Sequence, residues 1–374
     1  MESWNSCKNV LVIRPDNMGD LLMSGPAIHA LKESFGCKIT LLTSSMAAGI
    51  AAFLPGVDDV ITFNAPWVKC DAANETFFDV VEEIRRRAFD AAVLFTVFSQ
   101  NPLPTAMIAY LAGIPKRLAY CRENPYDLLT HWVPDKEPYD FVRHQVERDL
   151  QLVKSVGAVV KSKELQLHLP NNAWPAVEEK LTSNGVNVHR PWIILHAGVS
   201  EPKRQYPVAH WIEVAQRLVE ETGYQLLFTG NEKEKEAIEK ISSAVEKNTF
   251  NLAGSLSLQE FIMLVQHAPL VLSVNTATVH IAAAVATPIV VLYALTNPQH
   301  LPWMANGKAL FYDVPEEERS RNEVLCYVHE HYHPKNIGMI KPEEVVQAVK
   351  GILLNSNNSF MPVIVPLLPT DQLA

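Results

Sequence analysis

The chain twice repeats one local pattern, in which an apolar run leads through a polar loop into a stretch of helical spacing. The first run covers residues 10–13 and precedes an expected helix over 21–35. The second covers 192–195, and after a loop that ends at Pro207 we expect a helix over 208–221. Short runs of this kind are typical of strands buried on both faces of a parallel sheet, which need crossover helices. The pattern therefore predicts an α/β protein in which the same unit is built twice.

Strand and helix signals continue to alternate in both halves. In the first half, strands are expected over 38–43, 57–63 and 91–95, and helices over 77–89 and 143–156. In the second half, strands are expected over 224–228, 270–274 and 289–293, and helices over 232–245, 258–266, 342–354 and after Asn275. Such alternation gives a doubly wound sheet covered on both faces. We therefore expect two Rossmann-like domains.

The length of 374 residues exceeds what one core holds, since a domain averages roughly 150 residues. A polar stretch over 171–190 contains Pro175 and Gly185 and is predicted to be the linker. The first domain would then cover 1–170 and the second 191–354. Residues 355–374 are rich in Asn, Ser and Pro and are predicted to form a poorly ordered tail.

The charge of the chain argues against nucleic acid as a partner. The formal net charge is −9, and no basic stripe is interleaved with aromatic residues. Against this background the neighbouring cations Lys203 and Arg204 stand out. Such a pair can hold a small anion without making the whole surface attractive to phosphate.

The cysteines and the N-terminal residues predict a cytoplasmic location. The cysteines are scattered along the chain: Cys7, Cys37, Cys70, Cys121 and Cys326. They form no Cys-x-x-Cys pair and have no histidines at ligand spacing, so we expect reduced thiols and no metal site. No signal sequence and no apolar stretch of about 20 residues is found. Peripheral docking on the cytoplasmic face of the inner membrane remains compatible with this prediction.

Two common nucleotide motifs are missing. No Gly-x-Gly-x-x-Gly follows either opening strand, and no Gly-x-x-x-x-Gly-Lys-Ser/Thr is present, which argues against a nicotinamide dehydrogenase and a P-loop enzyme. In open α/β sheets, ligands bind beyond the carboxyl ends of the strands. The candidate loops therefore follow residues 13, 195, 228 and 274.

The first two loops carry an acid and two cations. Gly19 can let a backbone approach a ligand closely, and Asp20 can act as a general base at a domain cleft. The competing interpretation makes Asp20 an ordinary helix N-cap. In the second loop, Lys203 and Arg204 can grip a diphosphate, although a solvated surface pair is the simpler explanation.

The other two loops suggest a carboxylate for a ribose and a helix end for phosphates. In the third loop, over 230–234, a carboxylate can accept hydrogen bonds from ribose hydroxyls, or else it is only a charged helix start. The fourth loop, over 275–284, has small residues whose free N–H groups would lie at a helix N-terminus, which is an anion site. His280 can add a donor there or be a structural histidine.

Together these segments resemble glycosyltransferase family 9, the ADP-heptose:lipopolysaccharide heptosyltransferases, over residues 9–303. The resemblance implies a GT-B fold, in which two Rossmann-like domains face a central cleft. The opening strand with Met18-Gly19-Asp20 is similar to the family's strand followed by Met/Leu-Gly-Asp. This match puts the catalytic base on Asp20 and a donor contact on Asn17, beside Gly19.

The resemblance also implies a donor site in the second half. Residues 203–207 are similar to the family's Arg-Lys-Gln-Trp-Pro, which puts the phosphate-binding lysine on Arg204, next to Lys203. Glu234 falls on the ribose-binding glutamate and Leu256 on a residue that packs against adenine. Residues 275–280 are similar to the Asp-Thr/Ser-Gly-x-x-His segment that cradles the donor phosphates, and the match assigns this role to Asn275, Thr276, Ala277, Thr278 and His280.

Three positions depart from the family pattern. Asn275 replaces an aspartate and so removes a negative charge, and Ala277 replaces a glycine and adds a Cβ near the phosphates. Arg204 keeps the charge of a lysine in a planar fork. These departures bear on the identity of the donor and not on the fold.

The resemblance implies an inverting transfer of a sugar, with heptose from ADP-heptose as the expected donor and a lipopolysaccharide-core or related glycan as acceptor. No cofactor and no metal are expected, so cationic side chains and a helix end would stabilise the diphosphate. Two alternatives remain at this point: a sugar-nucleotide epimerase of similar architecture, and a non-catalytic sugar-nucleotide-binding protein, which the changes at Asn275 and Ala277 would explain.

Overall fold

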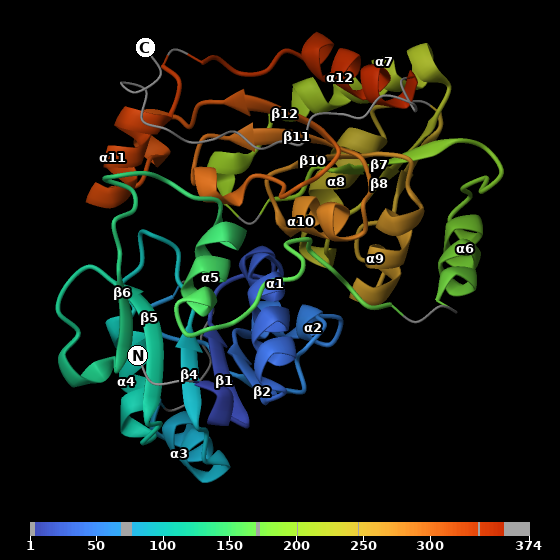
Figure 1. Cartoon of the computed structure of the whole chain (residues 1–374). Helices are drawn as coiled ribbons and strands as arrows, with labels where there is room; N and C mark the ends of the chain where they lie inside the picture. Colours follow the sequence, from blue (N-terminus) through green and yellow to red (C-terminus); the bar gives the residue numbers. More distant parts are fainter. Residues whose placement is uncertain are drawn as a thin grey trace.

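The computed structural model describes residues 4–68, 77–169, 173–199, 201–245, 247–335 and 337–354. These residues form two lobes, each built on one parallel sheet (Figure 1). The predicted fold class is confirmed in its architecture: the chain is an α/β protein with two doubly wound, Rossmann-like sheets. The predicted tail over 355–374 lies outside the described residues, and the predicted domain boundaries stay a prediction.

The first sheet has the order β3-β2-β1-β4-β5-β6, with every pairing parallel. Its strands are β1 (Asn9–Arg14), β2 (Lys38–Thr43), β3 (Asp59–Thr62), β4 (Ala91–Leu94), β5 (Lys116–Cys121) and β6 (His131–Pro134). Its helices are α1 (Met18–Phe35), α2 (Ser45–Ala51), α3 (Phe77–Arg87), α4 (Leu103–Leu111) and α5 (Gln145–Lys154), with short 3₁₀ turns η1 (Trp4–Ser6) and η2 (Tyr126–Leu128).

The second sheet has the order β12-β11-β10-β7-β8-β9, again all parallel. Its strands are β7 (Trp192–His196), β8 (Gln225–Phe228), β9 (Thr249–Asn251), β10 (Val271–Val274), β11 (Ile289–Ala294) and β12 (Gly307–Tyr312). The helices are α6 (Trp174–Ser183), α7 (Val208–Thr222), α8 (Lys235–Ser242), α9 (Leu258–His267), α10 (Ala277–Ala284), α11 (Glu323–Tyr332) and α12 (Pro342–Leu354), with 3₁₀ turns η3 (Pro202–Arg204), η4 (Glu232–Glu234), η5 (Pro298–His300) and η6 (Glu316–Glu318).

The two sheets have the same strand order when each is counted from its first strand. In both, the chain runs outward to one edge and then returns to the other side of the opening strand. The order reverses between β1 and β4 in one lobe and between β7 and β10 in the other. Ligands of doubly wound sheets bind at such switch points. The topology thus places one potential binding crevice in each lobe.

Helix α1 begins earlier than the sequence pattern predicts. It starts at Met18 rather than at residue 21, so Asp20 lies in its first turn and the expectation of an acid just before the helix is wrong. The helix packs against α2, α5 and α10 as well as its own sheet, which explains why most of its surface is apolar. Gly36, with φ of 56°, ends it in the left-handed conformation that favours glycine.

The stretch expected to be a linker contains helix α6. Pro175 stands in its first turn, where a missing N–H costs nothing. Val177 and Leu181 are buried, and Trp174 stacks on His267 of α9 with ring centroids 3.9 Å apart. The chain between the sheets is therefore partly a packed helix of the second lobe.

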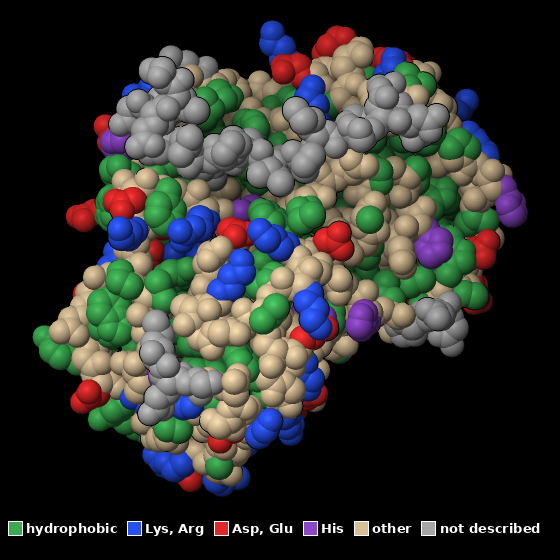
Figure 2. All heavy atoms as spheres, viewed as in Figure 1, with side chains coloured by type: hydrophobic (Ala, Val, Ile, Leu, Met, Phe, Trp, Pro, Cys, Tyr) green, Lys and Arg blue, Asp and Glu red, His purple; other side chains and the backbone are tan. Residues whose placement is uncertain are grey.

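The lobes share packed surfaces. One apolar cluster includes Leu22 and Val146 of the first lobe together with Val279 and Trp303 of the second. Helix α11 contacts the first lobe, where Tyr332 donates a hydrogen bond of 2.7 Å to the carbonyl of Pro138. On the face seen in Figure 2, several Lys and Arg side chains gather along the line where the lobes meet. Among the described helices, none is long and apolar enough to cross a membrane.

Candidate active site between the two lobes

A cleft of about 1660 Å³ lies between the lobes. It collects the loops that follow β1, β7, β8 and β10. Every residue predicted for the site lines it: Asn17, Gly19, Asp20, Lys203, Arg204, Glu234, Leu256, Asn275, Thr276, Ala277, Thr278 and His280. Both switch points thus open into one space, as the strand-end rule predicts.

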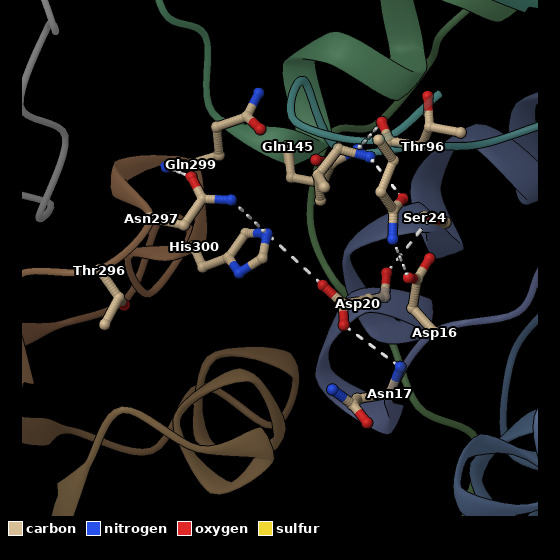
Figure 3. Close-up of polar contacts among 12 residues, drawn as sticks. Asp16, Asn17, Asp20, Ser24, Thr96, Gln145, Thr296, Asn297, Gln299 and His300 are labelled. Atoms are coloured by element: carbon tan, nitrogen blue, oxygen red, sulfur yellow. Dashed lines mark hydrogen bonds and ion pairs between the residues drawn. The ribbon is translucent and has the colours of Figure 1, made fainter. Parts of the chain in front are cut away.

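Asp20 caps its own helix and also faces the cleft. Its Oδ2 accepts a hydrogen bond of 3.2 Å from the backbone N–H of Asn17, so the carboxylate caps the helix from its third position (Figure 3). Its Oδ1 lies 3.5 Å from Nη2 of Arg14 and 3.4 Å from Nε2 of His300. The side chain is 13% exposed and faces the cleft. A capping carboxylate is therefore also available to a ligand.

A buried cation, Arg14, pairs with Asp20 on the side of the sheet. Arg14, the last residue of β1, is fully buried, and its Nε lies 3.1 Å from Oδ2 of Asp16. Burial opposes the charged form, but Asp16, Asp149 and Asp20 together raise the pKa of Arg14. Sequence reasoning missed Arg14 as a site residue, although an arginine at the end of a buried strand is a signal of a partner acid.

Asp149 of α5 is a second buried acid near Arg14. Ser24 and Gln145 each donate a hydrogen bond of 2.7 Å to its carboxylate. Burial raises the pKa of Asp149 to about 6, against the opposing charge of Arg14. The first lobe therefore surrounds Asp20 with a polar network that is anchored in its core.

The cations of the second lobe are held at the cleft by one acid. Nζ of Lys203 lies 2.8 Å from Oε2 of Glu201, and Nη2 of Arg204 lies 3.9 Å from the same oxygen. Nη1 of Arg204 donates to the carbonyl of Asn275 at 3.2 Å. Within the described part of the chain, Nε of Arg204 is buried without a hydrogen-bond partner. The pair is therefore anchored, not a freely solvated surface pair.

The N-terminus of α10 is open toward the cleft. Its N-cap, Thr276, makes no side-chain cap hydrogen bond, and the Thr276 hydroxyl is buried without a hydrogen-bond partner among the described residues. Ala277 and Thr278 begin the helix and line the cleft. Free N–H groups at a helix start attract an anion. This end of the helix is thus suited to phosphate oxygens.

His280 lies between the lobes. It is 5% exposed, and a Cβ at Gly19 would come within 2.9 Å of its Cδ2. Only a glycine at position 19 therefore lets α1 approach α10 this closely without a shift. Burial, together with His300, His144 and Arg204, lowers the pKa of His280 well below its ordinary value. The histidine is both packed and next to the proposed phosphate site.

Both the oxygen and the nitrogen of the Asn275 side-chain amide make hydrogen bonds. Its Nδ2 donates to the carbonyl of Ala294 and to the hydroxyl of Thr296, both at 3.4 Å, and its Oδ1 accepts from the N–H of Ala294 at 3.3 Å. An aspartate can only accept hydrogen bonds when ionised. Relative to an aspartate, the amide therefore adds two donated hydrogen bonds to the one it accepts, and together they tie the loop to β11 and the residues after it.

Glu234 stands at the third loop as predicted. Its Oε2 accepts a hydrogen bond of 2.7 Å from the N–H of Asn231 and so caps η4. Gly198 and Gly230 face this side chain so closely that a Cβ at either position would collide with it. Leu256 lines the same cleft. The cleft thus offers both an acid and an apolar side chain, the two kinds of group that a nucleoside can contact.

Comparison with known proteins gives the family. Residues 77–328 match the model described as glycosyltransferase family 9 (heptosyltransferase), which is more than half of the chain. The chain belongs to glycosyltransferase family 9. It is therefore a glycosyltransferase, as the resemblance in its motifs predicted.

Curated relatives extend over nearly the whole chain. Lipopolysaccharide heptosyltransferase 2 of Escherichia coli K12 is 25% identical over 92% of this chain and 98% of its own length. Lipooligosaccharide heptosyltransferase 2 of Haemophilus influenzae is also 25% identical, over 79% of this chain and 85% of its own.

Solved structures agree on the fold. A family 9 glycosyltransferase of Veillonella parvula superimposes with a TM-score of 0.73 at 17% identity, over 93% of this chain and 97% of that one. The structure of E. coli ADP-heptose heptosyltransferase II gives 0.69 at 22% identity, over 94% of this chain and all of that one.

Proposed function

We propose that this family 9 enzyme transfers a heptose from ADP-heptose to a lipopolysaccharide-core acceptor, with inversion at the anomeric carbon and Asp20 as general base. The observation that carries the proposal is the position of Asp20, which faces the cations and the open helix end of the other lobe across a single cleft. Because both line one cleft, the reacting carbon would lie between the base and the diphosphate site.

The proposed reaction is a single displacement. The acceptor hydroxyl loses its proton to Asp20 while its oxygen bonds to the anomeric carbon, and the bond from that carbon to the diphosphate oxygen breaks. ADP leaves with the electron pair. Attack from the face opposite the leaving group inverts the configuration.

The charge that develops on the leaving diphosphate needs stabilisation. Arg204, Lys203 and the N–H groups at the start of α10 lie on the wall where the diphosphate would bind. Preorganised donors of this kind act without reorganising when the bond breaks, which makes them effective in a closed site. Asn17, Gly19, Asn275 and His280 would complete the donor site.

The donor is inferred from the side chains that line the cleft and from the names of the relatives. Glu234 would accept hydrogen bonds from ribose hydroxyls, and Leu256 would pack against the base. The relatives carry names of lipopolysaccharide and lipooligosaccharide heptosyltransferases. Since the acceptor of such a reaction is a glycolipid, we propose that the enzyme works in the cytoplasm at the inner-membrane face.

Nucleotide binding tests the donor assignment. Calorimetric titration with ADP, UDP and GDP should give preferential binding of ADP without added metal. Arg204→Ala should weaken ADP binding by roughly 10- to 100-fold, because it removes a charged hydrogen-bond donor, which contributes about 1.5–3 kcal/mol. Arg217→Ala serves as the matched control, since Arg217 pairs with Glu221 and Glu343 away from the cleft.

The outcomes separate the parts of the proposal. Preference for UDP or GDP would contradict the ADP-sugar donor, and binding of none of the three would contradict the donor site. If ADP binds as proposed, incubation of ADP-heptose with truncated lipopolysaccharide should give a product one heptose heavier by mass spectrometry.

A further inference from the structure

His300 is the side chain that reaches across the cleft to Asp20. It belongs to η5 of the second lobe, and its Nε2 lies 3.4 Å from Oδ1 of Asp20 in the first lobe (Figure 3). Asn297 Nδ2 lies 3.3 Å from the same nitrogen and packs beside the ring. The sequence motifs gave no role to this histidine. Its place at the carboxylate is therefore a property of the assembled cleft.

The segment that carries His300 is fixed to the first lobe by its neighbours. Gln299 is fully buried: its Oε1 accepts from the N–H of Phe98 at 3.3 Å, and its Nε2 donates to the carbonyl of Arg143 at 3.1 Å. On the other side, Nε2 of His144 lies 2.6 Å from the carbonyl of Leu301. These contacts hold η5 against the first lobe, so the ring of His300 is presented to Asp20 at a set position.

The charges around His300 decide its form. Burial and the cations Arg14 and Arg204, with His144, lower the pKa of His300 well below its ordinary value. The ring is therefore neutral near pH 7. In the tautomer with its proton on Nε2 it can donate to a carboxylate oxygen of Asp20 without adding a third positive charge, and Nδ2 of Asn297 is then a neighbour of Nε2 and not its hydrogen-bond donor. Arg14 already supplies the charge on that side of Asp20.

We propose that His300 is a positioning residue that fixes the orientation of the Asp20 carboxylate from the opposite lobe. The inference rests on the proposed role of Asp20 as base. Asn17 and Arg14 hold the carboxylate from within its own lobe, while His300 contacts it only when the lobes are packed together. The base is thus completed by the contact between lobes. Misplacement of a reacting group by about 1 Å can cost on the order of 100-fold in rate.

The test compares two substitutions at one position. With ADP-heptose and truncated lipopolysaccharide, His300→Ala should lower kcat by roughly 10- to 100-fold and change the KM for ADP-heptose by less than about 3-fold. His300→Gln, which keeps a side-chain N–H donor, should recover most of the lost rate. His29→Ala is the control, because His29 lies on the same helix as Asp20 but pairs with Glu33.

A double mutant shows whether His300 acts through Asp20. If it does, His300→Ala added to Asp20→Asn should lower transfer by less than about 3-fold further, since residues that act as a unit are not additive. The proposal would be overturned if the rate losses of His300→Ala and Asp20→Asn were fully additive in the double mutant. It would also be overturned if His300→Gln were no faster than His300→Ala, or if His300→Ala lost as much donor affinity as kcat. Should His300→Ala melt below the wild type, His300→Leu replaces it, because leucine fills the space without a polar atom.

The same experiments keep the two proposals apart. Wild-type activity in Asp20→Asn would remove the base and with it the proposed mechanism. Inactive Asp20→Asn together with wild-type kcat in His300→Ala would leave the mechanism standing and overturn only the role of His300.

Discussion

Two helix N-termini face the same cleft, and only one of them is capped by a carboxylate of the protein. At the start of α1, the third residue is Asp20, whose carboxylate caps the helix. At the start of α10, the third residue is Val279, which is buried, and Thr276 makes no side-chain cap. A helix start favours negative charge in either case. The difference is whether the protein supplies that charge itself or leaves it to a ligand.

The residues around the two helix N-termini differ in the same way as their caps. Beneath Asp20 lie Arg14 and further buried acids that form a fixed network. Around the start of α10 stand small residues, and the cations of η3 lie nearby. One strand-loop-helix unit, used twice, thus gives a wall suited to a base and a wall suited to an anion. The residue at the third helical position decides which.

Asp20→Asn tests the closed helix end and should have the largest effect. Asparagine keeps an oxygen for the cap, but an amide does not take up the acceptor proton, so kcat should fall by about 1000-fold, within the 10²–10⁴ range typical of general bases. ADP affinity by calorimetry should change less than about 3-fold. Glu33→Gln, on the same helix, should behave like the wild type. Activity within about 10-fold of the wild type in Asp20→Asn would contradict the role of base.

Thr276→Asp would give the second helix end a carboxylate of its own, at the N-cap instead of at the third helical position. The new carboxylate should cap α10 and raise stability by about 1 kcal/mol in thermal melts. It should also repel the donor diphosphate and weaken ADP binding by at least about 10-fold. Thr276→Asn is the matched control, because it adds a neutral cap of the same size. Equal ADP affinity in the two variants would contradict a phosphate site at this helix.

The stability of the two lobes should respond differently to acid, and this is the smallest of the expected effects. Burial lowers the pKa of His196 in the second lobe to about 4, so the stability that comes from keeping it neutral is lost as pH falls from about 6.5 toward 4. Asp149 in the first lobe has its pKa raised to about 6, so its burial penalty is relieved as pH falls below 6. Burial also lowers the pKa of His144 in the first lobe to about 4, but the second lobe holds further buried histidines with lowered pKa values, His280 and His300. The second lobe should therefore weaken first.

Hydrogen exchange resolved by peptide would measure this difference. Between pH 7 and pH 5, after correction for intrinsic rates, protection around β7 should fall relative to β1 by the equivalent of roughly 1–2 kcal/mol. His196→Gln should reduce the loss. A first lobe that loses protection before the second would show that other groups dominate.

Local pattern predicted much of the fold. The bounds of β2 and α12 agree with expectation residue for residue, because both have uninterrupted periodicity. The segment over 103–134, with α4, β5 and β6, was not predicted, since β5 mixes Lys116 and Arg117 with its apolar residues. The start of α1 was placed late because glycine is a poor helix former. There, packing of Gly19 against His280 outweighs the local preference.

The sequence by itself determined the doubled α/β architecture and the loops that carry the site, because strand and helix periods and strand-end loops are local features. Every predicted site residue lines one cleft for this reason. Only the tertiary structure decided that His300 meets Asp20, and that Asn275 ties its loop to β11. Those contacts depend on how the lobes and strands are placed against one another. Side-chain spacing along a chain does not record that placement, since it arises from packing between segments that are far apart in sequence.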